Sequence, residues 1–283
     1  MSLRVSTLAC LFALGGGLAA WPAAASPGKA GAQPATAETT AVAIDVPQLY
    51  AQHCAACHAP NRLGAMGPAL LPDNLGRLRK TEAVKVIAEG RTATQMAGFA
   101  AQLSKEEIAA IADWIYTPVV PAPRWTEDDV KASRIQHVDP ATLSDKPVFD
   151  ADPLNLFLVV EAGDHHVSVL DGDKLEPIHR FQSRFALHGG PKFAAEGRYV
   201  FFGSRDGWIT KFDMWNLKVV AEIRAGINTR NVAVSPDGKH VAVANYLPNN
   251  LVLLDGELNL IKSIEAKDRD GKTSSRVSAV YDA

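Results

Sequence analysis

The stretch Cys54-Ala55-Ala56-Cys57-His58 decides the fold of the first part of this chain. Two cysteines separated by two residues and followed at once by a histidine form the C-x-x-C-H pattern that attaches a c-type haem. The two thiols reach both vinyl groups of one porphyrin and form thioethers, and the histidine falls under the iron as an axial ligand. We therefore predict haem c bound covalently at Cys54 and Cys57, with His58 on the iron. A zinc knuckle is the alternative, but it needs a second cysteine pair, and the chain has only 3 cysteines.

The sixth iron ligand is expected from a methionine further along the chain. Met66 lies only 8 residues past His58, which is too close for the chain to pass round the porphyrin edge comfortably. Met96 lies 38 residues past His58 and just precedes a predicted helix, so we predict Met96 as the ligand. His53 is a rival, but a residue beside Cys54 does not easily cross to the opposite face. Both methionines could also be ordinary core residues.

The helix after Met96 has a clear start. Ser104 and Glu107 are spaced as a capping box, and Leu103 with Ile108 fits a hydrophobic staple. Apolar residues then recur at helical spacing as far as Ile115.

Residues 46–118 resemble class I cytochrome c domains, with Pro68 and Leu70 in the usual loop beneath the haem. The resemblance implies a small helical bundle that exposes one haem edge for electron transfer. Ala97 departs from the family pattern, which often has proline after the ligand methionine.

The first 25 residues have the three parts of a secretory signal: Arg4, the apolar stretch from Val5 to Trp21, and Ala23-Ala24-Ala25. We predict a cleaved signal peptide, a periplasmic location and no stable membrane insertion. Cys10 is expected to be lost with the signal, because Thr7 stands where a lipoprotein signal would have leucine. Residues 26–45 are rich in Ala, Pro, Gly and Thr and are predicted to be a flexible leader.

The composition is that of a soluble globular protein. It is 47% hydrophobic and 21% charged, with a formal net charge of −2, and so lacks the basic excess of nucleic-acid binders. The proline-rich residues 118–125 indicate a stiff connector, so residues 119–150 are predicted to be a linker and lead-in between two domains.

A long-range repeat marks residues 151–283. The aspartates Asp171, Asp213 and Asp255 recur every 42 residues, and each is followed by a leucine and a β-rich segment. Four short strands at a period of about 40–45 residues are typical of β-propeller blades. We predict a two-domain α + β protein: a helical cytochrome c domain, then about three blades. Propellers close with about four to eight blades, so the chain is expected to be a C-terminally truncated piece of a longer protein.

The second half resembles the cytochrome cd1 nitrite reductase family. The resemblance rests on these segments: residues 154–157, 186–188, 197–201, 205–207, 220–223 and 244–248. It implies an eight-bladed propeller, when complete, that holds haem d1 non-covalently. His188, in the sequence Phe185-Ala186-Leu187-His188, matches the family's ligand to the d1 iron.

Haem d1 carries several carboxylates, and guanidinium groups are their natural partners. The resemblance therefore implies d1 contacts from Arg184, Arg205, Arg230 and Tyr246. No catalytic residue is assigned, because in this family the later blades would supply it.

The chain looks closest to the biosynthetic, NirN-type branch of the family, on residues 62–64, 74–75, 94–96 and 186–190. That branch oxidises dihydro-haem d1 to haem d1 and passes electrons through haem c. The alternatives are an NO-forming nitrite reductase and a simple electron-transfer cytochrome with an incomplete propeller. The expected partners are a periplasmic electron acceptor or donor, cytochrome cd1 nitrite reductase, and a second copy in a homodimer.

Overall fold

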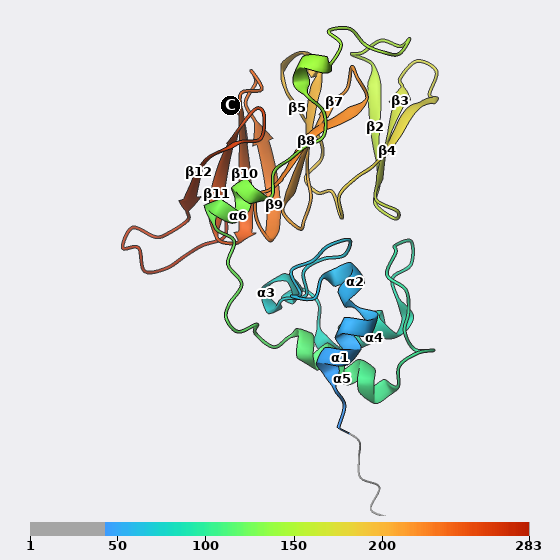
Figure 1. Ribbon diagram of the computed structural model, residues 1–283, viewed down its shortest axis with the longest axis vertical. Helices are drawn as coiled ribbons and strands as arrows, with labels where there is room; N and C mark the ends of the chain where they lie inside the picture. Colours follow the sequence, from blue (N-terminus) through green and yellow to red (C-terminus); the bar gives the residue numbers. More distant parts are fainter. Residues whose placement is uncertain (1–42, 283) are drawn as a thin grey trace, which may run out of the picture. The chain divides into compact units, whose positions relative to one another are not determined.

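The computed structural model describes residues 43–282, so the predicted signal peptide, Cys10 and most of the predicted leader lie outside the described residues. Short helices come first along the chain and antiparallel sheets follow (Figure 1). This order agrees with the predicted fold class.

Five helices make up the haem-motif domain: α1 (Val46–His53), α2 (Ala55–His58), α3 (Pro72–Leu75), α4 (Lys80–Glu89) and α5 (Lys105–Ile115). Helix α1 begins where the Asp45 carboxylate accepts a hydrogen bond from the Gln48 N–H at 3.0 Å. The predicted capping box of α5 is confirmed, because Ser104 and Glu107 bond each other's backbone N–H groups.

The apolar faces of these helices share one core. Helices α1 and α4 both pack against α5. The buried members are Tyr50, Leu75, Ala83, Ile87, Leu103, Ile108, Ile111, Ala112 and Ile115. The α5 periodicity read from the sequence therefore marks the face that packs.

The rest of the chain forms three antiparallel sheets. The first runs β2 (Leu156–Glu161), β3 (His166–Asp171), β4 (Pro177–Gln182). The second contains β5 (Lys192–Phe193), β6 (Tyr199–Gly203), β7 (Trp208–Asp213) and β8 (Lys218–Arg224), with the short 3-10 helix η2 (Ala195–Gly197) after β5. The third contains β9 (Asn228–Val234), β10 (His240–Leu247), β11 (Asn250–Asp255) and β12 (Leu260–Glu265).

The sequence repeat has a physical cause at one turn of each sheet. Asp171, Asp213 and Asp255 end the equivalent strands β3, β7 and β11. Each Oδ1 accepts two backbone N–H bonds from the turn that follows, at 2.8–3.1 Å. Each turn also holds a leucine at positive φ: Leu175 at 57°, Leu217 at 53° and Leu258 at 61°.

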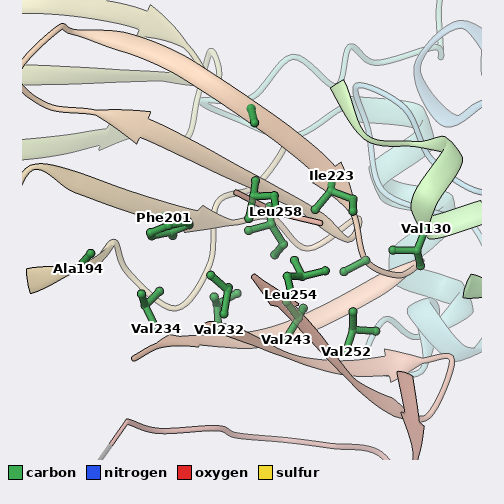
Figure 2. Packing of buried hydrophobic residues seen from close by; sticks show 14 residues of the cluster. Val130, Ala194, Phe201, Ile223, Val232, Val234, Val243, Val252, Leu254 and Leu258 are labelled. Carbon is green, nitrogen blue, oxygen red and sulfur yellow. The ribbon is translucent and has the colours of Figure 1, made fainter. Parts of the chain in front are cut away.

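Buried apolar side chains join neighbouring sheets. Between the second and third sheets, Phe201 and Ile223 lie in one cluster with Val232, Val243 and Leu254 (Figure 2). A separate cluster joins the first and second sheets through Val167, Val169, Val200, Phe202, Phe212 and Met214. This stacking is typical of propeller blades, and the described residues contain three such sheets.

The segment before β2 is structured. It contains α6 (Glu127–Ala132), β1 (Ile135–Gln136) and the 3-10 helix η1 (Pro140–Thr142). Strand β1 pairs with β8 and extends the second sheet, while Val130 of α6 is buried in the cluster of Figure 2.

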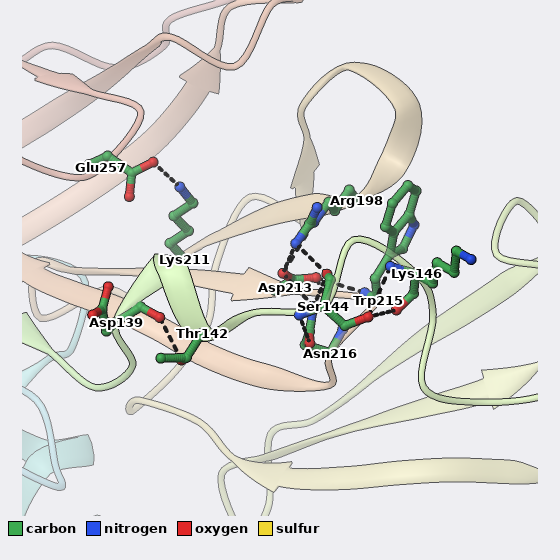
Figure 3. A network of polar contacts seen from close by, with 10 residues as sticks. All are labelled: Asp139, Thr142, Ser144, Lys146, Arg198, Lys211, Asp213, Trp215, Asn216 and Glu257. Atoms are coloured by element: carbon green, nitrogen blue, oxygen red, sulfur yellow. Dashed lines mark hydrogen bonds and ion pairs between the residues drawn. The ribbon is translucent and has the colours of Figure 1, made fainter.

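A polar network holds the chain just after η1 against the second sheet (Figure 3). Asn216 donates to the Ser144 carbonyl and to the Asp213 carboxylate, both at 3.0 Å, and Arg198 forms an ion pair with the same carboxylate at 3.0 Å. Lys211 reaches Glu257 of the third sheet at 2.7 Å. In residues 43–282, no helix is long and apolar enough to cross a membrane.

Candidate functional site

The C-x-x-C-H motif lies on one helical turn. Cys54 ends α1 and precedes α2, and its carbonyl accepts the His58 N–H at 2.9 Å. Both cysteine thiols are unpaired and half-buried. Burial, followed by the neighbouring Cys57, raises the pKa of Cys54 to about 11. This turn therefore places two thiols and one imidazole together, as a covalently attached haem requires.

His58 is oriented for metal ligation. Its side chain is 7% exposed, and its Nδ1 lies 2.8 Å from the Pro68 carbonyl oxygen. Because a carbonyl only accepts, Nδ1 carries the proton and Nε2 keeps its lone pair for an iron atom. Burial lowers the pKa of His58, which favours this neutral form.

Gly67 allows the loop that follows α2 to approach the His58 ring closely. A Cβ atom at Gly67 would lie 2.8 Å from Cε1 of His58, and the Gly67 N–H donates to the Cys57 carbonyl at 2.8 Å. The loop therefore rests on the His58 ring. Met66 belongs to this loop and its side chain is 54% exposed.

Met96 lies in a different loop, between α4 and α5. The Met96 carbonyl accepts from the Arg91 N–H at 2.9 Å, and Thr94 Oγ1 accepts from the Met96 N–H at 3.2 Å. A Cβ at Gly90 would lie 2.5 Å from the Met96 carbonyl oxygen, so only glycine fits there. The loop thus has a defined backbone, and iron ligation by the half-buried Met96 stays a prediction.

His188 is the second histidine of interest, and it lies on the loop before β5. Its N–H donates to the Gly203 carbonyl at 2.8 Å, which fixes it beside the end of β6. It lines a cavity of about 170 Å³ whose other walls include Val160 and Phe202. Burial, then the charges of Arg205 and Arg230, lower the pKa of His188, so the imidazole is neutral and suited to bind a metal.

The structure brings two of the predicted d1 contacts, Arg205 and Arg230, to His188, and the third, Tyr246, is coupled to these arginines. Arg230 Nη1 lies 2.8 Å from His188 Nε2. Burial, then the charge of Arg230, lower the pKa of Arg205. A hydrogen bond with Ser278 and the charge of Arg230 lower the pKa of Tyr246. Among the described residues 43–282, the charged groups that act on Arg205 are Arg230, Arg77 and Tyr246 and include no carboxylate, so its guanidinium is available to an anionic ligand.

Arg184, the fourth predicted d1 contact, is bound elsewhere. Its Nε and Nη2 donate to both oxygens of Glu222 at 2.9 and 2.6 Å, and its guanidinium stacks on the Trp208 ring at 3.8 Å. Glu222 also accepts from Thr210 at 2.8 Å and contacts His137 at 2.9 Å. In this structure Arg184 therefore stabilises the sheet, and its predicted contact with d1 remains a prediction.

Two arginines near Tyr246 were missed by reading the sequence. The Arg276 guanidinium lies 5.3 Å from the Tyr246 ring centroid, and both Arg77 and Arg276 contribute to lowering the pKa of Tyr246. They come from segments far apart in the sequence and belong to no motif. With Arg230, three arginines from separate segments therefore act on one phenol.

Comparisons with known proteins agree with both halves of this description. The family described as "Cytochrome D1 heme domain" matches residues 151–283, and "Cytochrome C oxidase, cbb3-type, subunit III" matches residues 42–115. These matches confirm the predicted haem c and d1-type haem domains.

Two curated relatives cover most of this chain. The dihydro-heme d1 dehydrogenase of Pseudomonas aeruginosa is 58% identical over 236 residues, which is 83% of this chain and 48% of that protein. A nitrite reductase of Stutzerimonas stutzeri is 30% identical over 253 residues, covering 81% of this chain and 44% of that protein. The chain thus spans about half the length of these relatives.

A solved structure shows the same arrangement of elements. It is described as dihydro-heme d1 dehydrogenase NirN in complex with DHE, and its TM-score is 0.78 at 58% identity. The match covers 83% of this chain and 51% of that chain.

Proposed function

Because the chain belongs to the cytochrome cd1 family, with a cytochrome c domain followed by a d1 haem domain, we propose that it oxidises dihydro-haem d1 to haem d1. Sequence identity favours oxidation of dihydro-haem d1 over nitrite reduction, since the chain is 58% identical to the dehydrogenase and 30% identical to the nitrite reductase. The likeness to the dehydrogenase structure supports the same choice.

The observation that carries the proposal is the group around His188. A neutral imidazole offers a ligand to the iron of a tetrapyrrole, and guanidinium groups offer partners to its carboxylates. Arg230 contacts that imidazole at 2.8 Å, the charge of Arg205 also acts on it, and Tyr246 is coupled electrostatically to both arginines. This set of donors fits an anionic iron tetrapyrrole.

Removing two hydrogens from the substrate releases two electrons and two protons. Attached haem c supplies a carrier that takes one electron at a time, so each turnover needs two transfers to an external acceptor. Cys54 and Cys57 hold that carrier, while Pro68 keeps the proton of His58 on Nδ1. In the d1 domain, His188 binds and Arg205 and Arg230 orient the substrate. We place the reaction in the periplasm, with a periplasmic redox protein as the acceptor.

The test is an optical titration of the chain carrying attached haem c with a d1-type haem. We expect a new chromophore that acid-acetone extracts in the wild type and that is lost in His188→Ala. The matched control is His240→Ala, since His240 is exposed at the start of β10 and should have no effect. Haem c bands alone in every variant would overturn the d1 proposal and leave an electron carrier.

A second measurement separates the two enzymatic readings. Protein loaded with dihydro-haem d1 should form haem d1 when an oxidant is present. Nitrite turnover by protein loaded with d1, without dehydrogenation, would instead establish a nitrite reductase.

A further inference from the structure

Arg62, four residues past His58, is a buried cation. Its side chain is 4% exposed, and its guanidinium stacks on Trp114 with Cζ 4.7 Å from the ring centroid. Burial of an arginine to this extent is rare unless a carboxylate is present to pair with it.

The hydrogen-bond partners of Arg62 are all neutral. Nε donates to the Leu70 carbonyl at 2.8 Å, and Nη2 donates to the carbonyls of Ile115 and Thr117 at 2.5 and 3.0 Å. No carboxylate of residues 43–282 forms an ion pair with it. Burial lowers the pKa of Arg62, yet arginine stays protonated in proteins. The positive charge is therefore held in place by carbonyls that do not neutralise it.

Arg62 is joined to the haem-attachment motif by its backbone and by the rings of Trp114 and Tyr50. The backbone N–H of Arg62 donates to the Ala59 carbonyl at 3.0 Å, and the Tyr50 hydroxyl donates to the same carbonyl at 2.8 Å. Tyr50 also packs on Trp114, with ring centroids 5.0 Å apart. Burial raises the pKa of Tyr50, and the positive charge of Arg62 opposes that rise. The Arg62 guanidinium thus acts on the phenol whose hydroxyl bonds the Ala59 carbonyl, directly after the haem-attachment motif.

We propose that Arg62 is a fixed charge that raises the reduction potential of haem c and so makes it a better electron acceptor from the substrate. A ferric haem carries one more positive charge than a ferrous haem, so a nearby buried cation disfavours the oxidised form. The effect is large because a charge screened by little water acts over a longer distance than an exposed one. The shift in potential rests on the haem c part of the proposed function only and stands whether or not d1 binds; its use in accepting electrons from the substrate rests on the whole proposed function.

The test is a spectroelectrochemical titration of the chain with attached haem c. Arg62→Gln removes the charge and should shift the oxidised-to-reduced equilibrium at least tenfold, which is about 59 mV lower for one electron. Arg62→Lys keeps the charge and should retain most of the potential. The control is Arg79→Gln, because Arg79 is 81% exposed on the same domain and should leave the potential unchanged.

An unchanged potential in Arg62→Gln, with intact haem c bands, would overturn the proposal and make Arg62 purely structural. If Arg62→Gln does not fold, the Arg62→Lys variant still tests whether the charge at this position sets the haem c potential. A buried ammonium loses its proton at lower pH than an exposed one. The potential of that variant should then fall at alkaline pH by a step that wild type lacks. The groups nearby are Tyr50, which burial keeps neutral, and the thioether-bound cysteines. No extra step in the variant would contradict the proposal.

Discussion

Arg230 binds both ring nitrogens of His188: its Nη1 lies 2.8 Å from Nε2, and its own carbonyl oxygen lies 3.2 Å from Nδ1. Since the carbonyl only accepts, Nδ1 is the donor and Nε2 accepts from the guanidinium. An iron atom can bind Nε2 only after the guanidinium has moved. If the proposed d1-type haem binds here, one of its carboxylates is the natural new partner for that guanidinium.

This exchange predicts a dependence on the carboxylates of the ligand. Arg230→Gln should weaken binding of a d1-type haem by about tenfold, because one charge-assisted hydrogen-bonded pair is lost. Binding of the methyl ester of the same tetrapyrrole should change little. Arg180→Gln is the control, since Arg180 is paired with Glu161 at 2.6 Å. If Arg230→Gln weakened binding of the free acid and of the methyl ester equally, Arg230 would not contact a carboxylate of the ligand.

The Met96 prediction can be tested against Met66. Methionine ligation raises haem potentials, and axial ligands set those potentials over about 0.8 V. Met96→Ala should therefore lower the haem c potential by on the order of 100 mV. Met66→Ala should leave it unchanged, because Met66 lies in the loop that rests on His58. The reverse result would assign the sixth ligand to Met66.

Gly67→Ala should disturb the His58 ring. The new methyl group would start 2.8 Å from Cε1 of His58, and such overpacking costs about 1–3 kcal/mol. We expect a lower melting temperature and altered haem c bands. Gly76→Ala is the matched control, as its nearest contact would be 3.7 Å away. Equal melting temperatures and equal haem c bands in the two variants would show that the loop moves away from the His58 ring at little cost.

Glu222→Gln should destabilise the second sheet. Glu222 is buried and bonds Arg184, Thr210 and His137, so the substitution leaves Arg184 without its counter-charge. Breaking a fully buried pair costs about 3–5 kcal/mol, and the Arg184 side chain is 31% exposed, so we expect about 2 kcal/mol in urea unfolding. Glu265→Gln, on an exposed pair, should change stability by less than about 0.5 kcal/mol.

The same carboxylate predicts a pH dependence. Burial opposes ionisation of Glu222, but the Arg184 pair and the hydrogen bonds prevail and lower its pKa below the ordinary 4.5. A lowered folded pKa contributes stability that is present above the unfolded pKa and is lost as the pH falls through the folded value. The difference in unfolding free energy between wild type and Glu222→Gln should therefore shrink as the pH falls below about 4.5. A difference that stays constant with pH would contradict this linkage.

The sequence predicted features that local chemistry determines. The capping box at Ser104 needs only neighbouring residues, and the aspartate repeat reflects one turn used three times. The C-x-x-C-H motif likewise lies on one turn of helix.

Contacts made across the fold left no pattern in the sequence. Arg62 bonds carbonyls, which every residue has, at positions as far away as Thr117. Arg184 resembles any other arginine until folding brings Glu222 to it from 38 residues away. The group of arginines around Tyr246 forms in the same way, from separate segments that share no spacing.

The lead-in segment finds its partners late along the chain. Trp125 bonds the carbonyl of Arg224, 99 residues on, and Glu127 accepts from Ser263, 136 residues on. The hydrogen bonds described above within the haem domain span far fewer residues; the longest, from Arg62 to Thr117, spans 55. Contacts between residues distant in sequence form slowly, because closing a long loop has an entropic cost. As the chain is synthesised from its N-terminus, the helical domain can therefore fold first, and the lead-in completes its contacts only after residue 263 has emerged.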